Sequence, residues 1–294
     1  MEISSKQVAD LRAETGVGMM ECKKALVEAR GDFEEARKIL RKKGLAAAAS
    51  KAGRATSEGL VVTHRTPVAA VVLEVNCETD FVARTEAFRA FADKLADRIA
   101  AHHAFGETRG DAAAVAGLSW PGEPSVADAV AQLVGTLKEN IQVRRFARLV
   151  PRPGEVFASY VHGNGRIGVV VGLPAGDETL ARDLAMHVAA SDPRFAARSE
   201  VTPEILAAEK EIARAQALAA GKPANVVDRI AEGKVEKFYQ ETVLTEQAFV
   251  KDPDKTVGQV IVERGGKAAL NLRFVRYKLG ESLGRPAGAT GPAN

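Results

Sequence analysis

The sequence contains few of the residues on which catalytic and metal sites are built. Only two cysteines occur in 294 residues, Cys22 and Cys77, and they form no CxxC pair. Neither a zinc site nor a disulfide framework is therefore predicted. No P-loop, HExxH or GxSxG motif is present. The five histidines, which lack the spacing of metal ligands, are His64, His102, His103, His162 and His187. We predict that the chain is not an enzyme and needs no cofactor.

Strong charge of one sign and long apolar runs are also missing. The 41 basic and 38 acidic residues nearly balance, with a net charge of +3. A dedicated nucleic-acid binder usually has a larger and more clustered basic excess, so no nucleic-acid partner is required. The longest apolar runs, such as Val68–Leu73, have the length of strands and cannot span a bilayer. Because the first residues also lack a signal-peptide pattern, we expect a cytoplasmic protein without a membrane partner.

The first 54 residues predict three short helices and a basic linker. Ser4 with Gln7 and Asp32 with Glu35 have the spacing of capping boxes, and apolar residues follow at helical spacing. Gly44 is expected to close the bundle. Three short helices in so few residues have the architecture of a ubiquitin-associated (UBA-like) module.

Residues 37–57 contain seven Lys or Arg and no acidic residue. One interpretation is an RNA-binding arm, which would suit an adaptor for RNA or nascent chains. The other is the C-terminus of a helix, whose dipole favours cations, followed by a solvated linker rich in alanine. We favour the second interpretation.

An internal repeat organises the rest of the chain. Phe91–Ala101 matches Leu180–Ala190 at an offset of 89, and Val71–Val75 matches Val169–Leu173 at an offset of 98. This pattern predicts a duplicated strand–strand–helix unit. The two offsets differ by nine. The first copy therefore has nine extra residues between its second strand and its helix. An enlarged loop in one copy of a repeated scaffold is a common place for function.

The predicted fold class is α+β, with small antiparallel sheets packed against helices. The expected division is a UBA-like module and basic linker at 1–54, a core N-subdomain at 55–151, a core C-subdomain at 152–281 and a flexible tail at 282–294. Pro203–Ala220 and Ala224–Ala231 predict an αα-hairpin inserted at about 203–232. Its expected seam residues are Ile205, Ile212, Val227 and Ile230. A helix near Thr256–Arg264 and a strand near Ala269–Tyr277 are expected to follow.

Two motifs have ordinary structural interpretations. Gly163–Gly168 matches GxGxxG, but it precedes a predicted strand instead of opening a helix, so it predicts a hairpin turn. Cys77 stands at a strand end without a predictable His partner, and we interpret it as a buried structural thiol.

The segment Thr79-Asp80-Phe81-Val82 lies inside the enlarged loop. In one interpretation Thr79 or Asp80 caps a helix and Phe81 is its first core residue. In the other, a rigid stem presents a carboxylate beside an exposed aromatic side chain. Such a pair suits insertion into another protein, because aromatic anchors dominate binding energy.

Two long stretches resemble signatures of the translation elongation factor Ts family. Residues 11–26, LRAETGVGMMECKKAL, resemble its N-terminal signature, and residues 74–83, EVNCETDFVA, resemble its second signature. Glu78 stands where many members have Gln, and neither residues 106–124 nor the C-terminal tail match a family pattern. Shorter matches are spread over nearly the whole chain: Glu139-Asn140-Ile141 with Arg144-Arg145, Ser159–Gly163, Met186–Ala190 and Lys255–Gly258.

This resemblance implies a guanine nucleotide exchange factor that binds elongation factor Tu in its GDP-bound and nucleotide-free forms. It implies that Thr79, Asp80, Phe81 and Val82 disturb the partner's Mg²⁺ and phosphate site. The implied partner-binding residues are Arg12, Met19, Met20, Lys23, His162, Val250 and Lys251. At least one of the paired methionines is expected in the core. The sequence leaves open the role of the hairpin and whether a homodimer or a two-to-two complex forms.

Overall fold

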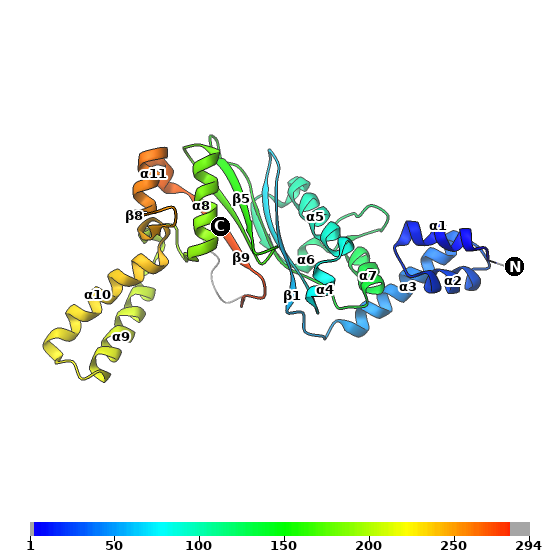
Figure 1. Cartoon of the computed structure of the whole chain (residues 1–294), viewed down its shortest axis with the longest axis horizontal. Helices are drawn as coiled ribbons and strands as arrows, with labels where there is room; N and C mark the ends of the chain where they lie inside the picture. Colours follow the sequence, from blue (N-terminus) through cyan, green and yellow to red (C-terminus); the bar gives the residue numbers. More distant parts are fainter. Residues whose placement is uncertain (1–2, 283–294) are drawn as a thin grey trace.

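N-terminal helices, two central sheets and a projecting pair of helices succeed one another along the long axis of the molecule (Figure 1). The computed structural model describes residues 3–282. Helices and small antiparallel sheets are both present, so the predicted α+β class is confirmed. None of the helices in this range is long and apolar enough to cross a membrane.

The N-terminal part consists of α1 (Ser5–Thr15), α2 (Met19–Glu28) and α3 (Phe33–Lys51). Ser4 and Gln7 form the predicted capping box, and Asp32 accepts a hydrogen bond from the amide of Glu35 at 3.0 Å. The three helices share a small apolar core of their own. Its fully buried members are Leu11, Cys22, Ala25, Leu26 and Ala36.

Gly44 does not end the bundle, and that prediction is wrong. It lies inside α3, where a Cβ atom would come within 3.2 Å of the carbonyl oxygen of Ala131. Ala131 belongs to α7 (Val126–Leu137), so the second half of α3 packs closely against the next part of the chain. Burial between two helices outweighs the helix cost of a glycine, about 1 kcal/mol.

The first sheet is antiparallel, with the strand order β1-β2-β4-β3. The strands are β1 (Glu58–Arg65), β2 (Ala70–Cys77), β3 (Thr108–Gly110) and β4 (Gln142–Leu149). On one face, α5 (Glu86–Ala101) and α7 contribute to a core with β2, in which Phe88, Leu95 and Ile99 are fully buried.

The second sheet repeats this plan with the order β5-β6-β9. Its strands are β5 (Val156–His162), β6 (Ile167–Leu173) and β9 (Arg273–Lys278), and α8 (Glu178–Ser191) packs on it. Each copy of the sequence repeat is thus an antiparallel hairpin followed by a helix. The predicted hairpin turn between β5 and β6 is confirmed; it spans residues 163–166, and Gly168 already belongs to β6.

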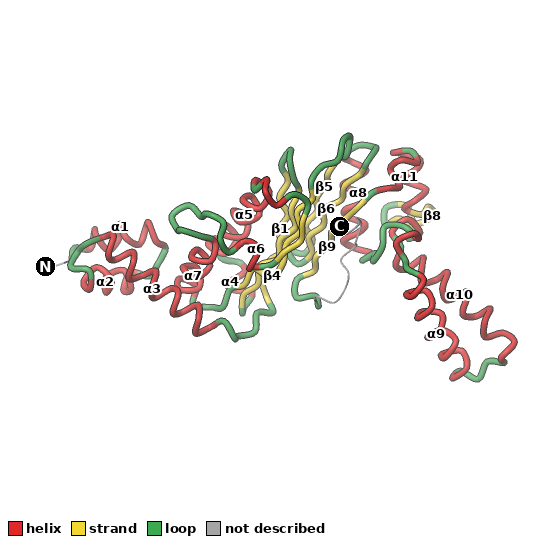
Figure 2. Tube along the Cα trace, turned by 180° about the vertical axis from the view of Figure 1, so that it is seen from behind, coloured by secondary structure: helices red, strands yellow, loops and turns green. Residues whose placement is uncertain are grey.

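The two sheets pack face to face between their helices. Figure 2 shows the strands in the middle, with α5 beyond one sheet and α8 beyond the other. Val61, Val72, Val170 and Val275 meet in the layer between the sheets. A Cβ atom on Gly168 would lie 2.6 Å from Val61, so a residue without a side chain is required for this close approach.

Two long helices project from the second sheet: α9 (Pro203–Ala219) and α10 (Ala224–Thr242). They pack along each other through residues that include Ala213, Ala217, Val227 and Ala231. Ile212, an expected seam residue, is 51% exposed, so that prediction is wrong. The second helix of the pair, α10, continues beyond its predicted end at Ala231, because Phe238 packs in an apolar cluster with Phe195 and Val201.

The remaining α-helices and strands are short. They are α4 (Asp80–Ala83), α6 (Ala112–Val115), β7 (Ala248–Phe249), β8 (Asp252–Thr256) and α11 (Val257–Gly265). The strand expected near Ala269–Tyr277 begins only at Arg273, since Lys267–Asn271 forms a 3-10 helix. Most of the tail predicted at 282–294 lies outside the described residues.

Candidate binding surface around the Thr79 loop

Thr79 begins a single helical turn directly after β2. Its backbone is extended (φ −126°, ψ 154°), and its hydroxyl accepts a hydrogen bond from the amide of Val82 at 3.4 Å. This is the geometry of an N-cap, so of the two candidate caps, Thr79 and Asp80, Thr79 caps the helix and Asp80 is its first residue. The resulting helix, α4, ends at Ala83, and Thr85 then caps α5 by accepting from the amide of Phe88.

Phe81 points into solvent. It is 78% exposed, the most exposed large apolar side chain among residues 3–282. Ala83 and Phe88 enter the core in its place, so the interpretation of Phe81 as the first core residue is wrong. An aromatic side chain held in water by a capped turn is available for burial in another molecule.

The carboxylate beside Phe81 has a partner within its own chain. Asp80 Oδ2 lies 2.7 Å from Nη2 of Arg84, one turn further along. The Arg84 side chain is exposed, and the Asp80 side chain is partly exposed. Val82 is half-buried against the core of the first sheet. The turn therefore presents one apolar and one acidic group outward and anchors itself through Val82 and Ala83.

The backbone of the loop is held from two directions. The thiol of Cys77 donates a hydrogen bond to the carbonyl oxygen of Thr79 at 3.1 Å. Cys77 is fully buried, and burial raises the pKa of its thiol to about 12. The predicted buried thiol is therefore confirmed. From the other side, the carboxylate of Glu139 accepts from the amides of Glu78 and Thr79.

Glu139 was missing from the predicted site. It lies in the segment Glu139-Asn140-Ile141, which carries part of the family resemblance, but that pattern assigns it no role. Only the fold brings it to Thr79, because β2 and β4 are paired neighbours in the first sheet.

The predicted N-terminal contact residues all lie on the surface of α1 and α2. Arg12 and Lys23 are exposed, and Met19 and Met20 are 38% and 64% exposed. The expectation that one methionine belongs to the core is wrong. The buried face of α2 is occupied instead by Cys22, Ala25 and Leu26, which follow at helical spacing.

His162 lies at the exposed end of β5, where its Nδ1 is 3.3 Å from the hydroxyl of Tyr160. The turn that follows is held against the start of β1, because the amide of Val61 donates to the carbonyl of Gly165 at 2.7 Å. The start of β1 pairs with Cys77 at the end of β2. His162 and the Thr79 loop thus lie at the same end of the two sheets.

Val250 and Lys251 form the turn between β7 and β8, far from the N-terminal helices (Figure 1). Val250 is 47% exposed, and its amide donates to Nδ1 of the buried His187 at 3.2 Å. Lys251 Nζ lies 2.6 Å from Asp183 on α8. The two turn residues are fixed from beneath, so they keep one orientation toward solvent.

The basic stretch at 37–57 is largely paired. Five of its seven cations contact acidic side chains of other segments or of the same helix: Arg37, Lys38, Arg41, Lys43 and Arg54. One of these pairs, Arg41 with Asp128 at 2.7 Å, joins α3 to α7. This pattern supports the helix interpretation and disfavours an RNA-binding arm.

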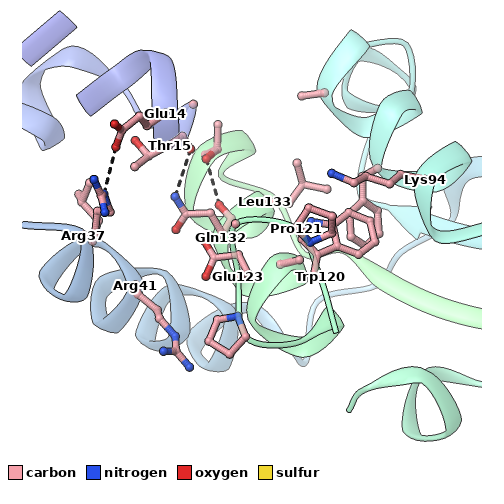
Figure 3. A pocket seen from close by; sticks show the side chains of 18 of the residues that line it. Glu14, Thr15, Arg37, Arg41, Lys94, Trp120, Pro121, Glu123, Gln132 and Leu133 are labelled. Atoms are coloured by element: carbon pink, nitrogen blue, oxygen red, sulfur yellow. Dashed lines mark hydrogen bonds and ion pairs between the residues drawn. The ribbon is translucent and has the colours of Figure 1, made fainter. Parts of the chain in front are cut away.

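A cleft of about 840 Å³ lies beside the contact of α3 with α7 and is lined by residues of α1, α3, α5 and α7. Figure 3 shows its mixed lining, in which Gln132 Nε2 donates to the carbonyl of Thr15 and Glu14 pairs with Arg37. On one side of the cleft, the ring centroids of Trp120 and Phe91 are 5.0 Å apart. None of the predicted site residues lines this cleft. Among residues 3–282, no three His, Cys, Asp or Glu side chains gather to hold a metal ion.

Comparisons with known proteins agree on one family. A family model described as Elongation factor TS matches residues 78–281, well over half of the chain. A protein named Elongation factor Ts from Thioalkalivibrio sulfidiphilus is 44% identical over 285 residues, which cover 96% of this chain and 94% of the relative. Another of that name, from Alkalilimnicola ehrlichii, is 46% identical over 283 residues, which cover 96% and 93%.

The family resemblance of the sequence motifs is therefore confirmed over nearly the whole chain, and it includes both the exposed Thr79 loop and the N-terminal helices. The chain belongs to the elongation factor Ts family.

Proposed function

We propose that this chain is the guanine nucleotide exchange factor for elongation factor Tu in cytoplasmic translation elongation. It binds elongation factor Tu in the GDP form, speeds the release of GDP and remains bound to the nucleotide-free form until GTP enters. The observation that carries this proposal is Phe81, 78% exposed on a capped and anchored turn.

Phe81 is the residue that enters the partner. A free aromatic side chain of this size gains roughly 1.5–3 kcal/mol on burial. Because Thr79 caps the turn and Val82 packs on the core, little conformational freedom is lost when the partner closes around it. That free energy is then available for displacing elements of the partner.

The target of this displacement is the partner's grip on nucleotide. GTPases of this kind hold the phosphates with P-loop amides and a magnesium ion. The ion is the largest local positive charge, so disturbing its coordination weakens phosphate binding strongly. Phe81 wedges between elements beside that site, and Asp80 contacts the displaced segment or opposes the anionic site. The coupling is reciprocal, since nucleotide weakens the factor's binding by the same ratio.

Phe81 and the turn Thr79–Val82 that carries it are called the prong. Other exposed residues bind the partner around this prong. The helices α1 and α2 contribute Arg12, Met19, Met20 and Lys23, a surface of adaptable thioethers flanked by cations. His162 supplies a contact near the prong, since both lie at one end of the sheets. Val250 and Lys251 reach a more distant part of the partner. In this arrangement the prong changes the release rate, and the outer contacts supply affinity.

The test is direct mixing of the full chain with elongation factor Tu loaded with a fluorescent GDP. Adding excess unlabelled GDP and increasing amounts of the chain should raise the release rate to a plateau far above the spontaneous rate. Light scattering on the isolated complex gives its stoichiometry. A release rate that does not change with the concentration of the chain would overturn the proposal.

A further inference from the structure

The turn between α7 and β4 reaches back to the Thr79 loop. α7 ends at Lys138, which adopts a left-handed conformation (φ +65°) and donates its amide to the carbonyl of Val134. A left-handed residue at this position reverses the chain sharply. The next two residues, Glu139 and Asn140, both contact the segment that carries the prong.

Glu139 accepts three hydrogen bonds from that segment. Its Oε2 accepts from the amides of Glu78 and Thr79, at 3.1 and 3.0 Å, and its Oε1 accepts from the hydroxyl of Thr79 at 2.5 Å. Bonds to an ionised acceptor are short and strong. The two amides lie just beyond β2, whose pairing with β1 ends at Cys77. Glu139 therefore supplies the hydrogen-bond acceptor that a neighbouring strand would otherwise provide.

The third bond determines what Thr79 can do. A hydroxyl has one proton to donate and two lone pairs that accept. Because the proton of Thr79 is directed at Glu139, its lone pairs remain for the amide of Val82, which begins α4. Glu139 thereby fixes the cap, the cap fixes the helical turn, and the turn fixes the direction of Phe81.

The neighbouring residue braces the same turn on the chain that leaves α3. The amide of Asn140 donates to Glu78 Oε1 at 2.6 Å, and its side-chain Nδ2 donates to the carbonyl of Arg54 at 2.8 Å. Asn140 is buried, and Arg54 itself reaches Glu78. The turn that carries Glu139 is therefore anchored by hydrogen bonds on both sides, which suits it to hold another loop in place.

We propose that Glu139 is a positioning residue for exchange: it holds the Thr79–Val82 turn so that Phe81 is already aimed before elongation factor Tu arrives. This inference rests on the proposed function. Glu139 is itself half-buried and acts through Thr79. Its loss should lower the maximal rate of GDP release and leave the docking contacts of α1, α2 and the β7–β8 turn unchanged.

The test compares Glu139→Ala and Glu139→Gln with the wild-type chain in GDP release across a full range of concentrations. Glu139→Ala should lower the plateau rate about tenfold and shift the half-saturating concentration less than twofold. Glu139→Gln should retain an intermediate plateau, since its carbonyl can accept from both amides while the charge and the hydroxyl's acceptor are lost. Hydrogen exchange of the Thr79 and Val82 amides should be faster in both variants.

Glu200 offers a matched control. It is also a half-buried carboxylate that accepts from a backbone amide, that of Ala196 at 2.8 Å, but it lies beyond the second sheet. Glu200→Ala should keep the wild-type plateau. Equal losses in both alanine variants would overturn the positioning role and indicate general destabilisation. A wild-type plateau in Glu139→Ala, with Phe81→Ala still slow, would overturn it while leaving the exchange function intact.

Discussion

Asp80 and Arg84 form an ion pair across one turn of the exposed prong, with 2.7 Å between Oδ2 and Nη2. The carboxylate of Asp80, next to Phe81, is therefore already paired with Arg84 when no partner protein is bound. Pairs this exposed contribute only about 0–1 kcal/mol. A partner can take over Asp80 at small cost, and Arg84 keeps it oriented until then.

Removing the internal partner should make Asp80 easier to engage. We expect Arg84→Ala to raise GDP release at sub-saturating concentrations of the chain by about two- to fivefold, the equivalent of up to ~1 kcal/mol. The gain should shrink in high salt, which screens exposed charges. Stopped-flow fluorescence measures it. Arg214→Ala, which breaks an exposed pair with Asp228 on the projecting helices, is the control. A slower rate in Arg84→Ala would show that Arg84 itself binds the partner.

The close contact between α3 and α7 can be tested at Gly44. A leucine there must push α3 away from Ala131 and Gly135, so we expect the unfolding free energy to fall by about 1–3 kcal/mol. Gly53→Leu is the control, since nothing lies within 4 Å of a Cβ atom at that position. Urea denaturation gives the comparison. Equal stability of the two variants would contradict the close packing of α3 on α7.

Local features of the site follow well from the sequence. The cap at Thr79 and the capping box at Ser4 each join residues three apart, so residue type and spacing suffice to predict them. The exposure of Phe81 could not be predicted in this way. An aromatic residue inside a helix fits a core equally well, and in the structure Val82 and Ala83 occupy the side of α4 that faces the core, which leaves Phe81 on the outer side.

Features that depend on distant segments were mispredicted or missed. Gly44 is a helix stop by propensity, but its environment is set by α7. The length of α10 depends on Phe238 meeting Phe195, which no local pattern contains. Glu139 is an ordinary surface acid until the pairing of β2 with β4 brings it to Thr79. Pairing between separated segments decides all three.

Buried His187 predicts a loss of stability in acid. Its Nε2 faces the oxygen of Gln247 at 2.9 Å and its Nδ1 accepts from the amide of Val250, so the ring is neutral. Burial lowers its pKa below the ordinary 6.5, and the hydrogen bond to Gln247 opposes this. As pH falls below 6.5, His187 is therefore protonated in the unfolded chain but stays neutral in the folded chain.

We expect the unfolding free energy to fall below pH 6.5 by up to about 1.4 kcal/mol per pH unit, until the lower folded pKa is reached. His187→Gln should lack this part of the pH dependence. Burial raises the pKa values of Glu123 and Glu200, and this favours the folded chain as pH falls, opposite to the effect of His187. That contribution is the same in the wild type and in His187→Gln. Urea denaturation between pH 5.5 and 7.5 measures the difference. Parallel pH profiles would contradict a neutral, buried His187.

The two thiols should be inert in the folded chain. Cys22 and Cys77 are fully buried, and burial raises the pKa of both, that of Cys77 to about 12. Since the thiolate is the reactive form, a coloured disulfide reagent at pH 7.5 should label neither residue in the native chain and both in urea. Rapid labelling of Cys77 without denaturant would show that the Thr79 loop opens readily.

Phe81→Ala tests the central claim most directly. Phe81 makes little contact with its own chain, so the unfolding free energy should change by less than about 0.5 kcal/mol. Leu218→Ala, at a side chain that is 56% exposed on α9, is the matched control. In stopped-flow release of fluorescent GDP from elongation factor Tu, we predict a plateau rate at least about tenfold below wild type for Phe81→Ala, equivalent to ~1.4 kcal/mol, and a wild-type plateau for the control. A wild-type plateau for Phe81→Ala would contradict the account.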